Sequence, residues 1–244
     1  MSISRFRHLL SLAAILILAW QVVSIAAQTV APSSDPYPMS KGTYWIYRGT
    51  VRWFNGREGG ATTKVTWRTE VLKVIRRGAF VAAVIKGFPS DLDWSDGDPK
   101  QVESLLIRTG KDDYYLLGAD EAQEGIKTLR DSNASVGGLL NADDLILRLP
   151  LKQGAKFCDA DSMARDDDMY CWMASSVDLV SLSDVKGVPA GGHEAYELRY
   201  VTLPDDTTYT FVPGVGIVSY EYHHHGTVAD TELKLAEFHL GSSN

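Results

Sequence analysis

The sequence predicts a mostly β protein, in which a single antiparallel domain carries one short helix near residues 120–130 and a strongly curved sheet. From Gly42 onward, apolar and polar side chains alternate with the period of two that is typical of strands with one buried face. Short candidate strands are separated by regular turns, as in sandwiches and barrels. Strands do not alternate with long helical segments, so a parallel α/β sheet is not expected. The alternatives left open are a half-open barrel and a sandwich.

The first hairpin is predicted over residues 44–75. Asn55-Gly56, the strongest short hairpin signal, separates two alternating segments, 44–53 and 63–75. In both segments, the aromatic and β-branched residues favour strands. Alternation places Trp45, Tyr47, Val51 and Trp53 on one face of the first segment, and Val65, Trp67, Thr69 and Val71 on one face of the second.

The remaining elements follow from similar patterns. The helix predicted over 120–130 has Asp120 as its expected cap, acids early, and Lys127 and Arg130 late, as the helix dipole favours. Pro213-Gly214-Val215-Gly216 predicts a sharp corner or bulge, because proline donates no ladder hydrogen bond and glycine adopts positive φ. Further strands are expected over 79–85, 104–108, 114–117, 144–149, 169–182, 193–203, 207–213, 216–225 and 227–240.

The first 27 residues have the features of a signal peptide. A basic start with Arg5 and Arg7 precedes an apolar run over 9–19, and small residues up to Ala27 offer a processing site. The alternative is an uncleaved anchor, since residues 9–27 nearly reach the length that spans a bilayer. Residues 28–40 are interpreted as a polar spacer and 41–241 as the β domain. The expected location is therefore periplasmic or secreted, with membrane contact only through an uncleaved leader.

Two cysteines, Cys158 and Cys171, are expected to form a disulfide, because an isolated pair in an oxidising compartment most simply pairs. The alternatives are a free reactive thiol and half of a metal site. Neither cysteine has another Cys or a His at metal-ligand spacing, which favours the disulfide. The bond would restrain an acidic loop between the two cysteines.

The net charge of the chain and the absence of several catalytic and nucleotide-binding motifs limit the functions that can be expected. The net charge is −7, and the loss of Arg5 and Arg7 with the leader takes it to −9. An acidic chain without a basic cluster is a poor partner for nucleic acid or anionic lipid. The sequence contains no G-x-S-x-G elbow, P-loop or dinucleotide fingerprint. A non-enzymatic role is favoured, and no catalytic residue is assigned.

Two polar clusters are candidate metal sites. In a strand, His223 and His225 would share one face and could supply two zinc ligands, although the sequence locates no third. The alternative is a polar strand end that meets solvent, with no cofactor. The aspartates between Asp91 and Asp98 do not match an EF-hand loop and are interpreted as an acidic surface loop.

The aromatic side chains of the predicted sheet form the candidate ligand site. On one side of a curved sheet they could line a cleft for an apolar or lipid-like molecule. The alternative is an ordinary core, since strands usually bury their aromatic residues. The six residues are Trp45, Tyr47, Trp53, Trp67, Tyr220 and Tyr222.

Several stretches resemble a group of uncharacterised bacterial secreted or periplasmic β-rich proteins. They are Tyr37-Pro38-Met39 through Trp45 (Y-P-x-x-x-G-x-x-W), Asp91-Leu92-Asp93-Trp94, the P-G-V-G segment over 211–216, H-H-G-T over 224–227, and Glu232-Leu233 through Phe238. The resemblance covers most of the chain after the leader. It implies an extracytoplasmic β protein and assigns no catalytic residue.

Three functions remain open. The leading expectation is a secreted or periplasmic binding or scaffold domain that holds an apolar ligand or an envelope protein. The second is a metal-dependent hydrolase centred on His223 and His225. The third is a structural envelope protein whose sheet edges recruit partners by strand addition.

Overall fold

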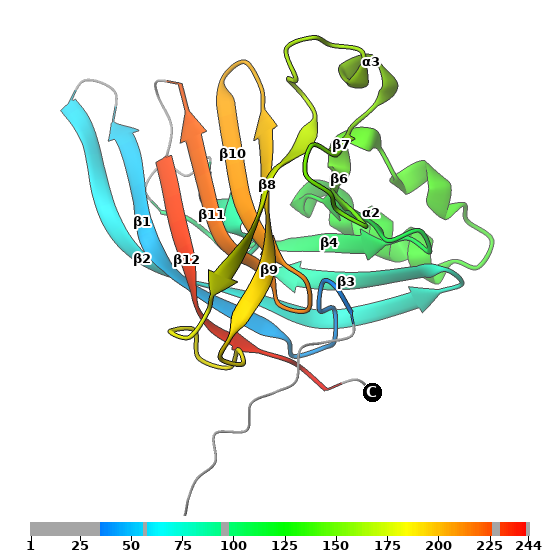
Figure 1. Cartoon of the computed structure of the whole chain (residues 1–244). Coiled ribbons are helices and arrows are strands. Elements are labelled where there is room, and N and C mark those ends of the chain that lie inside the picture. The colour runs from blue at the N-terminus through cyan, green and yellow to red at the C-terminus, as the bar shows by residue number, and fades with distance from the viewer. Residues whose placement is uncertain (1–34, 56–57, 94–97, 226–229, 243–244) are drawn as a thin grey trace, which may run out of the picture.

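The computed structural model describes residues 35–55, 58–93, 98–225 and 230–242, and these form a 12-stranded antiparallel sheet (Figure 1). The strand order is β6-β5-β4-β3-β2-β1-β12-β11-β10-β9-β8-β7. The first six strands therefore form one meander and the last six another, and the pairing of β1 with β12 joins them. The predicted leader and residues 28–34 lie outside the described residues.

The strands of the first meander are β1 (Tyr44–Asn55), β2 (Glu58–Arg77), β3 (Phe80–Lys86), β4 (Glu103–Arg108), β5 (Asp113–Leu117) and β6 (Leu145–Arg148). Those of the second are β7 (Lys156–Phe157), β8 (Trp172–Ser181), β9 (Gly192–Val201), β10 (Asp205–Val212), β11 (Gly216–His224) and β12 (Asp230–His239). The helices are α2 (Ala119–Arg130) and α3 (Ala160–Met163), with short 3-10 turns η2 (Pro89–Leu92), η3 (Val136–Leu139) and η4 (Ala142–Asp144).

The sheet curls so far that its two edges meet. β6 and β7 lie side by side (Figure 1), but no ladder of hydrogen bonds joins them in the described part of the chain. The result is a nearly closed, barrel-shaped sheet, which confirms the predicted fold class. The single predicted helix is α2, and the short α3 is an addition that the sequence pattern did not predict.

The concave face of the sheet encloses the main core. The predicted alternation is correct in β1, where Trp45, Tyr47, Val51 and Trp53 are buried while Arg52 is exposed. Trp45 Nε1 donates to the carbonyl of Val215 at 2.6 Å, whereas the buried Trp53 Nε1 has no hydrogen-bond partner among the described residues. Such bonds cancel the desolvation cost of burying a polar tip.

The domain begins before the predicted boundary. Tyr37 and Met39, which the sequence analysis placed in the spacer over 28–40, are buried in the main core. The Tyr37 ring stacks on Phe211 with 6.0 Å between centroids, and the nitrogen of Gly214 donates to Pro36 at 2.8 Å. Residues 35–40 are therefore part of the folded domain.

α2 covers part of the outer surface of the sheet. Its buried residues Ala122, Ile126 and Leu129 belong to a second hydrophobic cluster with outward-facing residues of β3 and β4. The helix begins one residue earlier than predicted, and its N-cap is Gly118 without a side-chain cap. Asp120 instead lies in the first turn, where its charge still favours the helix dipole.

A turn between β10 and β11 and a loop after β8 make specific backbone contacts. The Pro213–Val215 turn joins β10 to β11 as predicted, with Gly214 at φ 80°. The loop after β8 reaches β12, because the nitrogen of Phe238 donates to the carbonyl of Lys186 at 2.8 Å. Within the described ranges, no helix has the length and apolar character needed to cross a membrane.

Candidate functional site

The six aromatic residues predicted as a ligand site lie together inside the sheet, and all six are buried in one hydrophobic cluster. Trp67 Nε1 donates to the carbonyl of Gly87 at 2.9 Å, and Tyr47 OH donates to that of Ile217 at 2.9 Å. These side chains pack against one another and against neighbouring strands, so they act as core residues. Binding of a ligand there stays a prediction.

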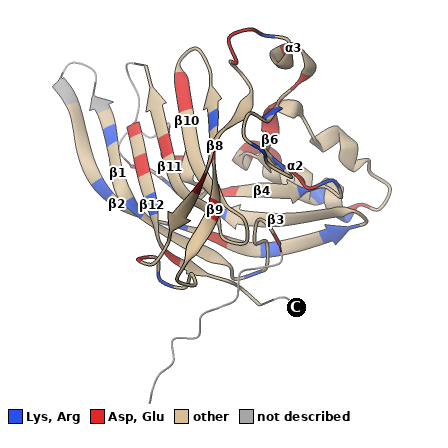
Figure 2. Cartoon of the chain, in the orientation of Figure 1, with Lys and Arg blue, Asp and Glu red and all other residues tan. Residues whose placement is uncertain are grey.

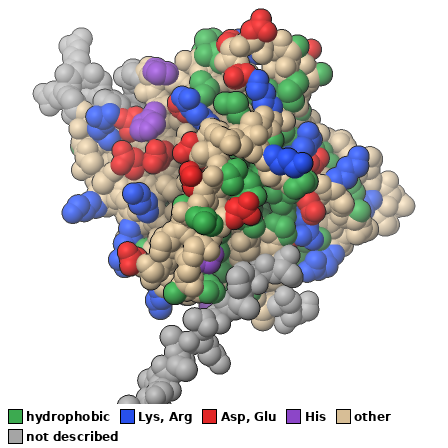
Figure 3. Space-filling view, viewed as in Figure 1, with side chains coloured by type: hydrophobic (Ala, Val, Ile, Leu, Met, Phe, Trp, Pro, Cys, Tyr) green, Lys and Arg blue, Asp and Glu red, His purple; other side chains and the backbone are tan. Residues whose placement is uncertain are grey.

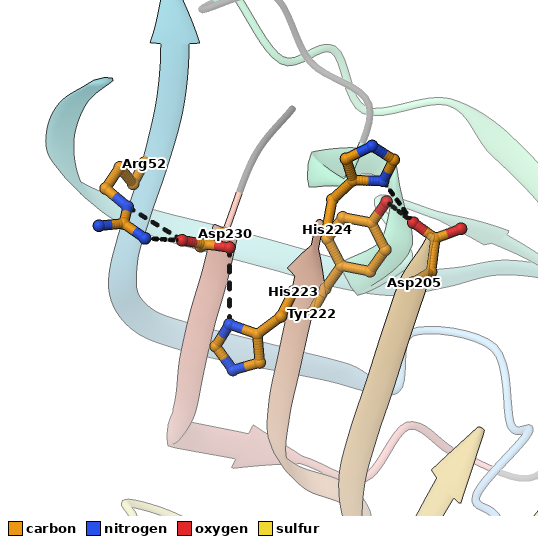
Figure 4. Close-up of polar contacts among 6 residues, drawn as sticks. All are labelled: Arg52, Asp205, Tyr222, His223, His224 and Asp230. Carbon is orange, nitrogen blue, oxygen red and sulfur yellow. Dashed lines mark hydrogen bonds and ion pairs between the residues drawn. The ribbon is translucent and has the colours of Figure 1, made fainter. Parts of the chain in front are cut away.

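The histidine cluster at the end of β11 is divided between two carboxylates (Figure 4). His224 Nδ1 lies 2.7 Å from Asp205 Oδ1, and Tyr222 OH donates to the same oxygen at 2.6 Å. Asp205 begins β10 and is directly opposite His224 in the ladder. The pairing therefore follows from the register of neighbouring strands.

His223 faces the other side of the strand. Its Nδ1 lies 3.6 Å from Asp230 Oδ1, and Asp230 also accepts a hydrogen bond from Arg52 Nε at 2.9 Å (Figure 4). A shallow polar groove of about 280 Å³ runs across these strands. Its lining residues are Thr50, Arg52, Thr62, His223, Asp230 and Glu232.

His225 lies just beyond the end of β11, which ends at His224, so it is not part of the strand in which it was expected to share a face with His223. The nitrogen of His225 instead donates to the carbonyl of Pro204 at 2.8 Å. Among the residues that the structure describes, no three His, Cys, Asp or Glu side chains converge in a way that could hold a metal ion. The zinc-dependent hydrolase thus has no support beyond the sequence pattern.

One acid of the Asp91–Asp98 segment is buried, contrary to the interpretation of this segment as a surface loop. Asp93, 5% exposed, accepts a hydrogen bond from Tyr220 OH, while its other oxygen has no partner. Burial raises the pKa of Asp93 well above its ordinary value, and the nearby charges of Asp205 and Asp91 raise it further. Residues 94–97 of this segment lie outside the described residues.

The predicted disulfide between Cys158 and Cys171 is present and fixes the start of β8. It ties the end of β7 to the residue that precedes β8. β7 pairs with β8 only at its first two positions, and Ala174 then exchanges backbone hydrogen bonds with Gly154 and Ala155. A bulge between Ala174 and Ser176 follows.

Beyond this bulge, β8 is an open edge strand. Residues 176–181 pair with β9 on one side, and in the described chain no backbone hydrogen bond covers their other side. Figure 1 shows β8 continuing past β7 to a free arrowhead. Because alternate residues of an antiparallel strand direct their N–H and C=O groups to opposite sides, about half of these groups point to solvent.

The side chains along this open edge include apolar and acidic groups. Leu179 is 79% exposed, and Glu194 lies directly opposite it on β9. Asp178 and Glu197 are also exposed, and none of the three carboxylates forms an ion pair within the described ranges. Acidic bands on β8 and β9 are visible in Figure 2, and in Figure 3 apolar side chains reach the surface among acidic ones on this face.

The opposite edge of the sheet is protected. β6 has only four residues, and the carbonyl of Ile146 accepts a hydrogen bond from Tyr209 OH. Arg148 projects from this strand and pairs with Asp113 at 2.8 Å, and Pro150 follows. Short length, charge and proline are devices that prevent pairing with foreign strands. The edge at residues 176–181 has neither proline nor lysine.

The sequence analysis did not single out this edge. Residues 176–181 form an ordinary alternating segment, and which side of a strand lacks a partner depends on the order of the whole sheet. The sequence does place Leu179 next to an acid, Asp178, but it cannot show whether that leucine is exposed or buried.

No family model matches the chain, and no curated protein matches it. Among solved structures, it is similar to an exported protein with a YMCC-like fold from Bacteroides fragilis, at 13% identity and a TM-score of 0.40 over 85% of this chain and 100% of the other. It is also similar to a lipoprotein from Parabacteroides distasonis, at 13% identity and a TM-score of 0.35 over 86% of this chain and 100% of the other.

Proposed function

We propose that this chain is an exported, non-enzymatic binding scaffold that captures an extended segment of another polypeptide by adding it as a strand to β8. The observation that carries the proposal is the open edge at residues 176–181 beside the exposed Leu179. Main-chain hydrogen bonds give affinity in strand addition, and alternate side chains give specificity.

Three features of the fold support this role over the other two expectations. The six aromatic side chains proposed to hold an apolar ligand are buried in the main hydrophobic cluster, as core residues are. The histidines pair with carboxylates of neighbouring strands rather than converging on one point. The disulfide and the two contacts of Ala174 hold the start of β8 rigidly, which preorganises the open part of the strand.

The location belongs to the same proposal. The signal-peptide pattern over residues 1–27 and a disulfide closing a 13-residue separation are both typical of a protein that leaves the cytoplasm. An extracytoplasmic scaffold would meet extended segments of other exported proteins there.

Amide hydrogen exchange tests the proposal directly. The protein would be incubated with three synthetic eight-residue peptides, in which valine alternates with lysine, glutamate or serine. We expect at least one peptide to slow exchange of the amides within residues 176–181, because an added strand accepts hydrogen bonds from them. If no peptide changes exchange in these residues, strand addition at β8 is refuted.

A matched pair of variants guards against nonspecific effects. Leu179→Lys places a charge on the open edge, whereas Leu203→Lys alters an equally exposed leucine (72%) in the turn between β9 and β10. Only the first variant should abolish the protection, and equal effects of both would contradict the assignment.

A further inference from the structure

The acidic surroundings of the open edge indicate which segment it accepts. We infer that the strand added to β8 is basic, with lysine or arginine alternating with apolar residues along an extended segment of a different protein. This inference rests on the proposed function, since it assumes that β8 pairs with an incoming strand.

The side chains of the open edge are divided between the two faces of the sheet. Successive residues of a strand point to opposite faces, so Asp178 and Ser176 share one face while Leu179 and Val177 share the other. Glu197 lies directly opposite Ser176 on β9 and therefore shares the face of Asp178. One face of the open edge thus carries Asp178 and Glu197, and the other exposes Leu179, with Glu194 opposite it on β9.

The basic side chains near the open edge are already paired with other acids. Arg199 Nε donates to Asp206 at 3.0 Å, and Lys186 Nζ pairs with Glu237 at 3.0 Å. Asp178 and Glu197 form no ion pair in the described part of the chain, and Glu197 accepts a hydrogen bond only from the uncharged hydroxyl of Ser175 at 2.5 Å, so neither carboxylate is neutralised by direct contact with a base.

The order of residues along the open edge sets which side chains an antiparallel partner must carry. A side chain opposite Asp178 lies about 5 Å away. One opposite Ser176 lies on the same face as Glu197 but two strand spacings, about 10 Å, from it, a distance that a lysine and a glutamate side chain can bridge together. Residues opposite Leu179 and Val177 face apolar side chains. The fitting partner therefore alternates basic and apolar residues with a period of two.

A second copy of this chain fits the edge less well. Antiparallel pairing centred on Leu179 would join the two leucines, but it would bring Glu194 of both copies together on the leucine face and Asp178 and Glu197 of both copies together on the other face. Like charges on neighbouring strands are destabilising. The whole chain is also acidic, with a net charge of −7, which adds repulsion between copies.

Fluorescence anisotropy with labelled peptides tests the inference. The probes are two eight-residue peptides in which valine alternates with lysine or with glutamate. We expect the lysine peptide to bind at least about tenfold more tightly at low salt, and this preference to shrink as salt screens the charges. Asp178→Asn and Glu197→Gln should each weaken the lysine peptide about two- to fivefold, whereas Leu203→Lys should not.

Backbone methylation separates strand addition from simple attraction between charges. Two further lysine peptides carry N-methyl groups on alternate residues, in the two staggered patterns. Because only one edge of an added strand bonds to β8, one methylation pattern should abolish binding while the other preserves it. Loss or retention of binding with both patterns would overturn the inference.

The remaining outcomes distinguish the two proposals. Equal protection of residues 176–181 by the lysine and glutamate peptides would refute a basic partner but keep strand addition. A dimer in sedimentation velocity that Leu179→Lys dissociates would identify a second copy as the occupant, and would also refute the basic partner. Absence of both binding and protection with every peptide would refute the inference together with the proposed function.

Discussion

Replacement of Asp93 by Asn should make the free energy of unfolding less dependent on pH. The carboxyl group is 5% exposed, one oxygen has no hydrogen-bond partner, and the other accepts one bond from Tyr220. Burial is the main cause of its raised pKa. Asn has nearly the same shape and can keep the bond to Tyr220, but it has no proton to release.

The sign and size follow from proton linkage. Asp93 titrates near 3.8 in the unfolded chain and at a much higher pH in the folded protein. The stabilising effect of its bound proton is fully present below pH 3.8 and is lost as the pH rises towards the folded pKa. Within that window each pH unit costs about 1.4 kcal/mol, so two units cost roughly 2.7 kcal/mol.

Urea unfolding at pH 5 and pH 7, followed by tryptophan fluorescence, measures this effect. The wild type should lose more stability than Asp93→Asn between the two pH values, by up to about 2.7 kcal/mol. Asp91, whose pKa burial raises to about 6, leaves some dependence in both proteins. The exposed Asp98→Asn variant is the control and should match the wild type. If Asp93→Asn loses as much stability as the wild type, the carboxyl is not protonated in the fold.

Other perturbations have equally definite outcomes. Replacing Cys158 and Cys171 with Ser should lower the free energy of unfolding by about 3 kcal/mol, and equal urea midpoints in the wild type and variant would contradict this. Gly187→Ala should cost about 2 kcal/mol or more, because φ is 88° and a Cβ would lie 1.9 Å from a backbone carbonyl oxygen; Gly138→Ala, which meets open space, is the control. Trp45→Phe should cost at least about 1–3 kcal/mol by leaving a buried carbonyl without its donor, as thermal and urea unfolding can check. EDTA should leave the melting temperature unchanged, because the described residues contain no group of three His, Cys, Asp or Glu side chains able to hold a metal ion. A fall in the melting temperature would instead support a bound metal ion.

Elements with a strong period of two could be predicted from the sequence. β1 and β2 have aromatic and β-branched residues at alternating positions, and the predicted alternation in β1 and the pairing of the two strands were correct. β7 has two residues, too few for any period, and α3 lies in the loop closed by the disulfide. The strand predicted from Met169 begins at Trp172, since Asp168 and Tyr170 have positive φ and cannot continue a ladder.

The functional residues were harder to predict because they depend on strand order. The sequence analysis placed His223 and His225 on one face, but the ladder with β10 ends at His224 and pairs it with Asp205. Asp93 looks like a solvated acid in the sequence, yet the segment after β3 turns inward and brings it to Tyr220. The openness of β8 follows from the brevity of β7, which no local pattern encodes.

The pairing of β1 with β12 also constrains how this chain reaches its final form. Gly241 bonds to Thr43 across a separation of 198 residues, so β1, which pairs early with β2, gains its second neighbour only when almost the entire polypeptide is available. Assembly should therefore be slow and late, as expected for sheets with distant partners. A circularly permuted gene that opens between β6 and β7 and joins the old ends would place all twelve strands in spatial order, and should fold faster with the same architecture.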